Sequence, residues 1–259
     1  MNHGLGIWLI RPEAEMLGMV LQQQLGGTVH RPWCAPSTPD LLSHKEKFAL
    51  AYRQHAHWIF LGATGIAVRF LAEQVADKHT DPAVVVVDEA GRFAISLLAG
   101  HEGGANALAY RVAARIGAVP VITTATEACK TLVLGIGCRK DVSQERIAAA
   151  VQQALGPRML TQVREVATID VKQEEPGLLA FCAAHNLPLR IIARSTVAQR
   201  AWVTAPSAWV SQQIGVDGVC EPCALIASPR GNLVVPKSTL DGVAVAIVED
   251  IWSTECKVY

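Results

Sequence analysis

A histidine, two consecutive glycines and an asparagine lie in the segment LLAGHEGGANALA, residues 97–109, between an apolar run and a helical pattern. Gly103 and Gly104 can present backbone N–H groups at a helix start, where such groups hold an anion or a developing oxyanion. The imidazole of His101 can move a proton, and Asn106 can orient a substrate oxygen without adding charge. The alternative is structural, since glycines before a helix allow close backbone packing and the histidine can cap the helix.

A second candidate anion site follows the apolar run WIFLGA. Thr64 and Gly65 are followed by Arg69 about one helical turn later, so hydroxyl, amide and guanidinium groups can surround one anion. A plain strand-to-helix junction with a threonine cap explains the same residues without a ligand. These residues alone leave both interpretations open.

Further candidate residues lie at the ends of predicted strands. Thr123 and Thr124 follow the apolar run of a later strand, and Gly100 begins the histidine segment. Since ligands in open α/β sheets bind beyond the carboxyl ends of the strands, these three segments, each directly after a predicted strand, are the leading candidates for a binding site. Asp88 precedes the run FAISLL that leads into the histidine segment, so it is our candidate carboxylate for a proton-transfer pair with His101. A solvated turn is the alternative for Asp88.

The cysteines do not form a recognisable metal or disulfide pattern. Cys220 and Cys223 frame CEPC, but a structural zinc site needs about four ligands and no second pair is present. We therefore interpret them as two thiols at a helix start. Cys138 follows a strand in a glycine-containing loop with no histidine nearby in the sequence, so packing is the alternative to a nucleophile. The seven scattered cysteines are expected to be free thiols.

Composition excludes several classes of function. With 51% hydrophobic and 18% charged residues, the 259-residue chain is typical of a folded enzyme rather than a disordered protein. The 23 basic and 23 acidic residues balance, so no basic excess indicates nucleic-acid binding. Neither a dinucleotide fingerprint nor a nucleotide phosphate loop is present, which leaves a nucleotide-binding α/β module unsupported. No secretory leader or membrane-length apolar run is evident, so we expect a soluble, cytoplasmic protein without a membrane partner.

The elements that must position these residues alternate along the first half. Apolar strand patterns take turns with amphipathic helix patterns, which predicts an open α/β sheet. The clearest helix is expected over 105–116, ending at Gly117, because its apolar residues share one stripe. A further helix is expected from Thr64 to Val75, and residues 88–92, DEAGR, predict a hairpin turn.

A second α/β unit is predicted from residues 132–140, where an apolar strand enters a glycine-containing loop. Ser143 is the expected N-cap of the next helix, and further helices are expected to start at Pro176 and Pro206. Two closing strands, LVVP and VAVAIV, are expected to flank the loop KSTLDG, residues 237–242.

The predicted division falls between residues 127 and 130. The expected domains are therefore 1–128 and 131–259, and the fold class is α/β, with each domain an open mixed sheet flanked by helices.

An ordered set of motifs resembles one known family. The first group is GATGIAVR at 62–69, VVVVDEAGRFAISLLAGHEGGANALA at 84–109 and GAVPVITTAT at 117–126. The second group is LVLGIGCRKDVS at 132–143, ATIDVKQEEPGLLAF at 167–181, TAPSAWVSQQIGVDGVCEPCAL at 204–225 and VPK at 235–237. The first group resembles the amino-terminal domain of the CbiG family of cobalamin biosynthesis, and the second resembles its carboxy-terminal domain.

The resemblance implies a reaction and its ligand. Members of the family are cobalt-precorrin-5A hydrolases of the anaerobic route to vitamin B12. They open the δ-lactone of the macrocycle and release acetaldehyde, giving cobalt-precorrin-5B. The implied arrangement is a tetrapyrrole bound in a cleft between two α/β domains, facing the carboxyl ends of the first domain's strands. Cobalt enters as part of the substrate, so no protein-held metal or other cofactor is implied.

The candidate residues identified above fit this chemistry. His101 is the candidate acid and base, Gly103 and Gly104 donate to the oxyanion, Asn106 positions the substrate, and Asp88 supports proton transfer. The acetate and propionate arms of the substrate call for cationic, hydroxyl and N–H donors. The candidates for binding them are Thr64, Gly65, Arg69, Gly100, Thr123, Thr124, Gly137, Arg139 and Lys237.

One departure from the family bears on these expectations. Longer members carry a middle segment between the domains, whereas here Thr126 is followed almost at once by Leu132. The site is then more open, or a partner supplies a lid, and a homodimer or contact with other enzymes of the pathway stays open. A non-catalytic corrinoid carrier is the rival function, since a stand-alone relative of the carboxy-terminal domain exists in the aerobic pathway. The complete histidine-glycine motif favours the enzyme.

Overall fold

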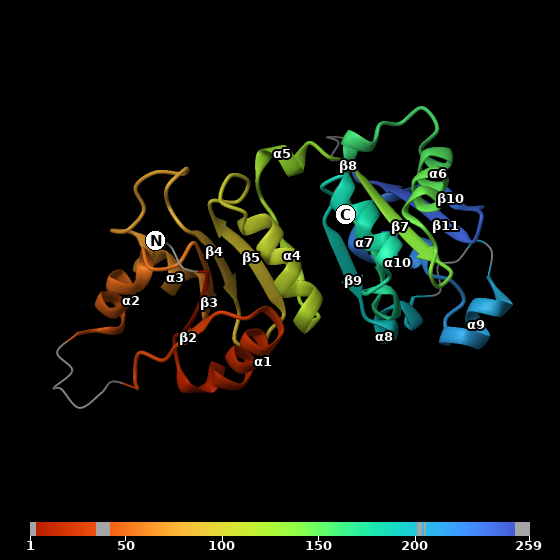
Figure 1. Cartoon of the computed structure of the whole chain (residues 1–259). Coiled ribbons are helices and arrows are strands. Elements are labelled where there is room, and N and C mark those ends of the chain that lie inside the picture. Colours follow the sequence, from red (N-terminus) through yellow and green to blue (C-terminus); the bar gives the residue numbers. More distant parts are fainter. Residues whose placement is uncertain (1–3, 35–41, 201–203, 205, 252–259) are drawn as a thin grey trace, which may run out of the picture. The chain divides into compact units, whose positions relative to one another are not determined.

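The computed structural model describes residues 4–34, 42–200, 204 and 206–251 of the chain. It divides into two compact units, Met1–Thr124 and Ala125–Tyr259, coloured red to yellow-green and green to blue in Figure 1. Each unit has its own sheet and core, and each is described by itself. In the described part of the chain, no helix has the length and apolar character needed to cross a membrane.

In the first unit, the described residues form a six-stranded sheet in the order β2-β1-β3-β4-β5-β6. The strands are β1 (Leu5–Leu9), β2 (Thr28–His30), β3 (His57–Leu61), β4 (Ala83–Val87), β5 (Phe93–Leu98) and β6 (Val119–Val121). Strands β2, β1, β3 and β4 are parallel to one another. Strand β5 is antiparallel to β4, and β6 is parallel to β5. The sheet is therefore mixed, which confirms the predicted fold class for this unit.

Helices cover both faces of this sheet (Figure 1). They are η1 (Pro12–Ala14), α1 (Glu15–Leu25), α2 (His44–Tyr52), α3 (Thr64–Leu71) and α4 (Ala105–Ile116). Apolar side chains of α1 and α4 pack on one face, and those of α2 and α3 pack with Trp58 and Phe60 on the other. Strand β4 is buried along its whole length because both faces are covered, which explains its unbroken run of valines.

Local signals in the first unit were accurate where turn or cap chemistry was distinctive. The predicted turn 88–92 joins β4 to β5, and the predicted helix 105–116 is α4. Gly117 ends this helix with a φ of 72°, in the left-handed region that favours glycine. The helix expected from Thr64 to Val75 is shorter, because α3 ends at Leu71 and turns follow.

In the second unit, the described residues form a five-stranded sheet in the order β10-β11-β7-β8-β9. The strands are β7 (Leu132–Cys138), β8 (Val163–Ile169), β9 (Leu189–Ile192), β10 (Asn232–Leu240) and β11 (Val243–Glu249). Strands β7, β8 and β9 are parallel, whereas β11 is antiparallel to both β7 and β10. This second mixed sheet also agrees with the predicted fold class.

The helices of the second unit again lie on both faces of the sheet. They are α5 (Ala125–Ala128), α6 (Gln144–Leu155), η2 (Leu160–Gln162), η3 (Asp170–Lys172), α7 (Pro176–Ala184), α8 (Arg194–Ala198), α9 (Ala208–Ile214) and α10 (Cys220–Ala227). Helices α6 and α7 pack on one face, and α8, α9 and α10 pack on the other. As predicted, Ser143 caps α6 by accepting from the Arg146 amide, and Pro176 is the first residue of α7.

Two predictions for the second unit were wrong. The helix expected to start at Pro206 begins at Ala208, because the Ser207 side chain caps it by accepting from the Val210 amide. The loop expected over residues 237–242 is mostly strand, since β10 continues to Leu240. The turn itself contains Asp241 and Gly242, with φ values of 47° and 85°. Such a two-residue turn fits the right-handed twist of a hairpin and leaves the polar residues before it in the strand.

Candidate functional site

The direction of β5 separates the polar segments of the first unit. Because β5 pairs antiparallel with β4, with Leu98 opposite Val84 and Ala94 opposite Val87, the chain leaves β5 at the edge where β3 and β4 begin. The segment after β3, which carries Thr64, leaves at the opposite edge. The candidate segments that follow β3 and β5 therefore lie at opposite edges of the sheet.

Asp88 lies in the turn before β5, so the length of this strand separates it from the histidine segment. At about 3.3 Å per residue, six residues span about 20 Å. The Asp88 carboxylate accepts from the Arg92 and Phe93 amides at 2.7 and 2.8 Å and pairs with the Arg92 side chain at 2.8 Å. Burial opposes ionisation, yet these bonds hold the pKa of Asp88 below its ordinary value. The predicted proton-transfer pair of Asp88 with His101 is contradicted, and the turn interpretation holds.

The histidine segment forms a tight turn onto α4. Gly104 is the N-cap with a φ of 85°, and a Cβ on Gly103 would lie 2.5 Å from the Ala99 Cβ. The amides of Ala105 and Asn106 donate to the carbonyls of Ala99 and Gly100 at 3.2 and 3.0 Å. Within the described residues, the Gly103 and Gly104 amides donate no hydrogen bond, and the His101 side chain is exposed. The loop thus combines open N–H groups with an accessible imidazole.

Asn106 connects this loop to two neighbouring segments. Its Oδ1 accepts from Ser96 Oγ at 2.8 Å, and its Nδ2 donates to Thr124 Oγ1 at 3.0 Å. A Cβ on Gly100 would lie 2.7 Å from Thr124 Cγ2 and 2.8 Å from Asn106 Oδ1, so no larger residue fits there. Asn106, Gly100 and Thr124 therefore form one packed unit behind the loop, while Thr123 is exposed beside it.

The segment after β3 holds its own polar groups. Ala63, not Thr64, is the N-cap of α3, so Thr64 is the first helical residue. Arg69 Nη1 donates to the Gly65 carbonyl oxygen at 2.9 Å within the same helix. The expected threonine cap is wrong, and the Arg69 guanidinium is partly engaged with its own helix.

Sequence reasoning missed a pair of histidines in this unit. His30 Nε2 lies 3.0 Å from His55 Nε2, and His30 packs against the rings of Trp8 and Trp58. Burial and the neighbouring His55 lower the pKa of His30 to about 4. The two residues are far apart in the sequence, and no motif signals their meeting.

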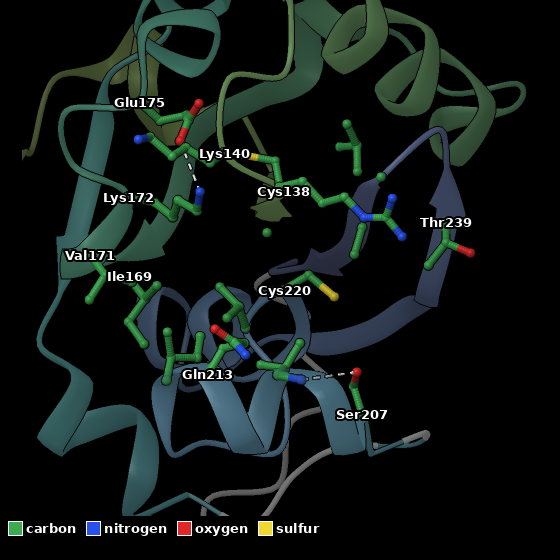
Figure 2. A pocket seen from close by; sticks show the side chains of 18 of the residues that line it. Cys138, Lys140, Ile169, Val171, Lys172, Glu175, Ser207, Gln213, Cys220 and Thr239 are labelled. Carbon is green, nitrogen blue, oxygen red and sulfur yellow. Dashed lines mark hydrogen bonds and ion pairs between the residues drawn. The ribbon is translucent and has the colours of Figure 1, made fainter.

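The second unit contains a pocket of about 810 Å³ where β7 and β8 end and the β10–β11 hairpin turns. The predicted residues Gly137, Arg139 and Lys237 all line it. Figure 2 shows Lys140, Lys172 and Glu175 on one side, Ser207 and Gln213 on the opposite side, and Cys138 and Cys220 between them. In this unit the structure brings the sequence-predicted residues together.

Glycine residues of β7 allow the start of α10 to approach this strand closely beside the pocket. A Cβ on Gly135 would overlap the Cys220 carbonyl oxygen, and one on Gly137 would lie 3.1 Å from the Val219 Cβ. The backbone of α10 therefore packs directly against the backbone of β7. This close approach is a role for Gly137 that the sequence did not reveal.

Charges of both signs surround the pocket, and several are already paired. The buried Glu175 accepts from the Asp141 amide at 2.6 Å and pairs with Lys172 Nζ at 2.8 Å. The Arg139 amide donates to the Gly242 carbonyl, which fixes its backbone against the hairpin turn. Among the described residues, the side chains of Arg139 and Lys140 make no ion pair. The pocket therefore offers exposed cations for an anionic ligand.

The pocket thiols are suited to packing rather than to nucleophilic attack. Burial raises the pKa of Cys138 to about 11 and that of Cys220 to about 12, and it also raises the pKa of Cys223. A thiol is a poor nucleophile when its thiolate is this disfavoured. Cys220 and Cys223 lie at the start of α10, as expected, and Cys256 lies outside the described residues. The described chain contains no cluster of three metal-ligating side chains.

Two mixed α/β units, each carrying polar loops beyond its strands, define the class of this protein. Residues 46–127 match the family model described as Cobalamin synthesis G N-terminal. Residues 132–248 match the model described as Cobalamin synthesis G C-terminus. Together these ranges cover about three quarters of the chain. The chain therefore belongs to the cobalamin synthesis G family, which confirms the resemblance found in the motifs.

Individual relatives match different portions of the chain. It is 61% identical over 77 residues to "Cobalt-precorrin-5A hydrolase" of Salmonella typhimurium, covering 30% of this chain and 22% of that protein. It is 25% identical over 281 residues to "Probable cobalt-precorrin-5A hydrolase" of Methanocaldococcus jannaschii, covering 76% and 87%. It is 29% identical over 124 residues to "Protein CobE" of a Sinorhizobium species, covering 47% and 80%. The match to the Salmonella protein thus spans about a fifth of its length.

Proposed function

We propose that this protein is a cobalt-precorrin-5A hydrolase, which opens the δ-lactone of its substrate and releases acetaldehyde to give cobalt-precorrin-5B. The observation that carries the proposal is the loop at the start of α4, where the open amides of Gly103 and Gly104 accompany the exposed His101. Membership of the cobalamin synthesis G family and the 61% identical segment of a named hydrolase support it.

The loop suits the chemistry of lactone opening. His101 removes a proton from water as the water oxygen adds to the lactone carbonyl carbon. The amides of Gly103 and Gly104 stabilise the oxyanion that forms on the carbonyl oxygen. When the ring C–O bond breaks, the protonated His101 returns the proton to the leaving oxygen. The neutral His101 then removes that hydroxyl proton as the aldehyde C=O bond forms, while the C–C bond breaks and its electron pair passes to the macrocycle.

The pocket of the second unit suits binding of the substrate's carboxylate arms. Its volume of about 810 Å³ lies within the range of small-molecule sites. Arg139 is exposed there and its guanidinium can bind a carboxylate through two parallel hydrogen bonds, while Lys140 and Lys237 add positive charge. Cobalt belongs to the substrate in this scheme, so the reaction needs no cofactor held by the protein. We place the reaction in the cytoplasm.

The direct test is to incubate the purified protein with cobalt-precorrin-5A and measure acetaldehyde, with heat-denatured protein as the control. Substrate binding is measured in parallel by the change in the corrinoid absorption spectrum. We expect acetaldehyde in proportion to consumed substrate. Binding without acetaldehyde would contradict the hydrolase and support a corrinoid carrier. Absence of both would overturn both proposals.

A further inference from the structure

Glu221, the glutamate between the two cysteines of CEPC, accepts hydrogen bonds from two other segments of the chain. Glu221 lies in the first turn of α10 and is only 1% exposed. Its Oε2 accepts from the Thr204 amide at 2.6 Å, and its Oε1 accepts from the Lys237 amide at 2.8 Å. Burying a carboxyl group is costly unless both oxygens find donors, and the helix N-terminus also favours negative charge there. This one side chain therefore connects α10 to two other segments.

The first connected segment is an irregular part of β10. Val235 pairs with Ile247 and Ser238 pairs with Val245, so three steps along β10 match two along β11. A bulge of this kind disrupts the regular ladder and redirects the bulged residue. The amide of Lys237 lies inside this irregularity and donates to Glu221. The backbone of a pocket-lining residue is thus fixed by α10 as well as by the sheet.

The second connected segment leads into α9. The Thr204 amide donates to Glu221, and shortly afterwards Ser207 caps α9 and donates its amide to the Asp217 carbonyl at 2.9 Å. Ser207 and Gln213 line the pocket on the side opposite Lys172 (Figure 2). Glu221 therefore anchors the beginning of the segment that forms this wall.

We propose that Glu221 is a positioning residue that holds two walls of the pocket, the α9 segment and the bulge of β10, and so sets its affinity for a polycarboxylate tetrapyrrole. The choice of ligand rests on the proposed function. Two backbone amides from separate segments converge on one side chain, and a carboxyl group provides both acceptors at once. A side chain with a single acceptor leaves one segment unattached.

The test uses Glu221→Gln in the full chain, because glutamine has the same shape but only one acceptor oxygen. Hydrogen exchange is measured at Thr204 and Lys237, and affinity is measured by titration with uroporphyrin, a macrocycle with eight carboxylates. We expect at least one amide to exchange about tenfold faster and the Kd for uroporphyrin to rise about tenfold. If acetaldehyde release is observed, KM should rise similarly while kcat stays within about twofold.

A second variant tests the same contact from its other end. Thr204→Pro removes the donor and leaves the buried carboxyl group in place. We expect it to weaken uroporphyrin binding in the same direction as Glu221→Gln, and it carries the test if that variant does not fold. Glu145→Gln is the matched control, since Glu145 is an exposed acid in the first turn of α6 and does not line the pocket. Its affinity should equal that of the wild type.

The outcomes separate this proposal from the function. Folded Glu221→Gln and Thr204→Pro proteins with wild-type affinity would overturn the positioning role, even if acetaldehyde is released. Weakened uroporphyrin binding with faster amide exchange would support it, even if the wild-type protein releases no acetaldehyde. A wild-type protein that binds neither uroporphyrin nor cobalt-precorrin-5A would overturn the positioning role together with the binding site.

Discussion

The two sheets place the polar loops that follow their strands differently. In the second unit β7 and β8 are parallel neighbours, so their carboxyl ends contribute Gly137, Arg139 and Lys172 to one pocket. In the first unit β5 runs against β4, so the loop of His101 emerges at the edge opposite Thr64. The comparison shows that the edge at which a loop emerges depends on the direction of its own strand. A single hairpin turn is enough to move a candidate catalytic loop to the other edge of the sheet.

The largest expected effect separates the two edges of the first sheet. His101→Ala should lower the rate of acetaldehyde release by about 10²- to 10⁴-fold, because it removes the proposed acid and base. Asp88→Asn should change the rate by less than about twofold, because Asp88 lies at the far end of β5. The measurement is acetaldehyde release under single-turnover conditions with both variants. Comparable losses in the two would show that strand direction does not separate their roles.

The next largest effect is a loss of stability when the close packing of α10 on β7 is disturbed. Gly135→Ala should destabilise the second unit by about 3 kcal/mol, because the added Cβ overlaps the backbone carbonyl oxygen of Cys220. Gly137→Ala should cost about 1 kcal/mol, since the added Cβ meets a side chain at 3.1 Å that can shift. Urea unfolding of both variants provides the comparison. Equal urea midpoints for the two variants would mean that the backbones of α10 and β7 are not in direct contact at Gly135.

A smaller effect compares the two arginines proposed for substrate carboxylates. Arg139→Ala should weaken uroporphyrin binding by about tenfold, because a hydrogen bond to a charged group contributes about 1.5 kcal/mol. Arg69→Ala should change it little, since Arg69 lies in the first unit and donates to the Gly65 carbonyl. Titration of each variant with the porphyrin tests this difference. A larger loss with Arg69→Ala would reverse the assignment of the anion site.

The smallest expected effect is a pH dependence confined to the first unit. The pKa of His30 is lowered from 6.5 to about 4, chiefly by burial, so between these values the unfolded chain binds more protons than the folded chain. The stability of this unit should therefore fall as the pH is lowered from about 6.5 to about 4, by on the order of 1 kcal/mol because the ring is partly exposed. Urea unfolding midpoints at several pH values measure the slope.

The variant His30→Gln should flatten that slope. His79→Gln is its control, because it removes an exposed imidazole without changing the buried rings around His30. A slope that persists in His30→Gln would assign the acid sensitivity to other groups.

The sequence predicted the elements whose ends carry strong local chemistry. Gly117 and Ser143 marked helix boundaries correctly, because a left-handed residue and a capping hydroxyl act within one turn. Pro206 misled because a better cap, Ser207, follows it directly. The bulge at Lys237 was hidden inside a polar stretch that is typical of a loop.

The candidate sites divided along the same line. Gly137, Arg139 and Lys237 were predicted as substrate-binding residues along with residues of the first unit, and these three line one pocket. The pairing of Asp88 with His101 followed sequence proximity and failed. Sequence patterns report which residues begin and end a strand, but its direction depends on long-range pairing. For the same reason the two amide bonds of Glu221 could not be anticipated, since their donors come from segments that meet only in the folded chain.

The place of β11 in its sheet has a consequence for synthesis. It lies between β10 and β7, with Val243 opposite Cys138 and Glu249 opposite Leu132. During synthesis, one edge of β7 therefore stays unpaired until residues near 249 emerge from the ribosome. All strands of the first sheet, by contrast, have been made once Val121 is added. At 5–20 residues per second, the interval from β9 to β11 lasts roughly 3–11 s. During that interval the unpaired edge of β7 can pair with a strand of another chain. Pairing with β11 removes this aggregation site, so the second unit is protected only after the carboxy-terminal hairpin has been made.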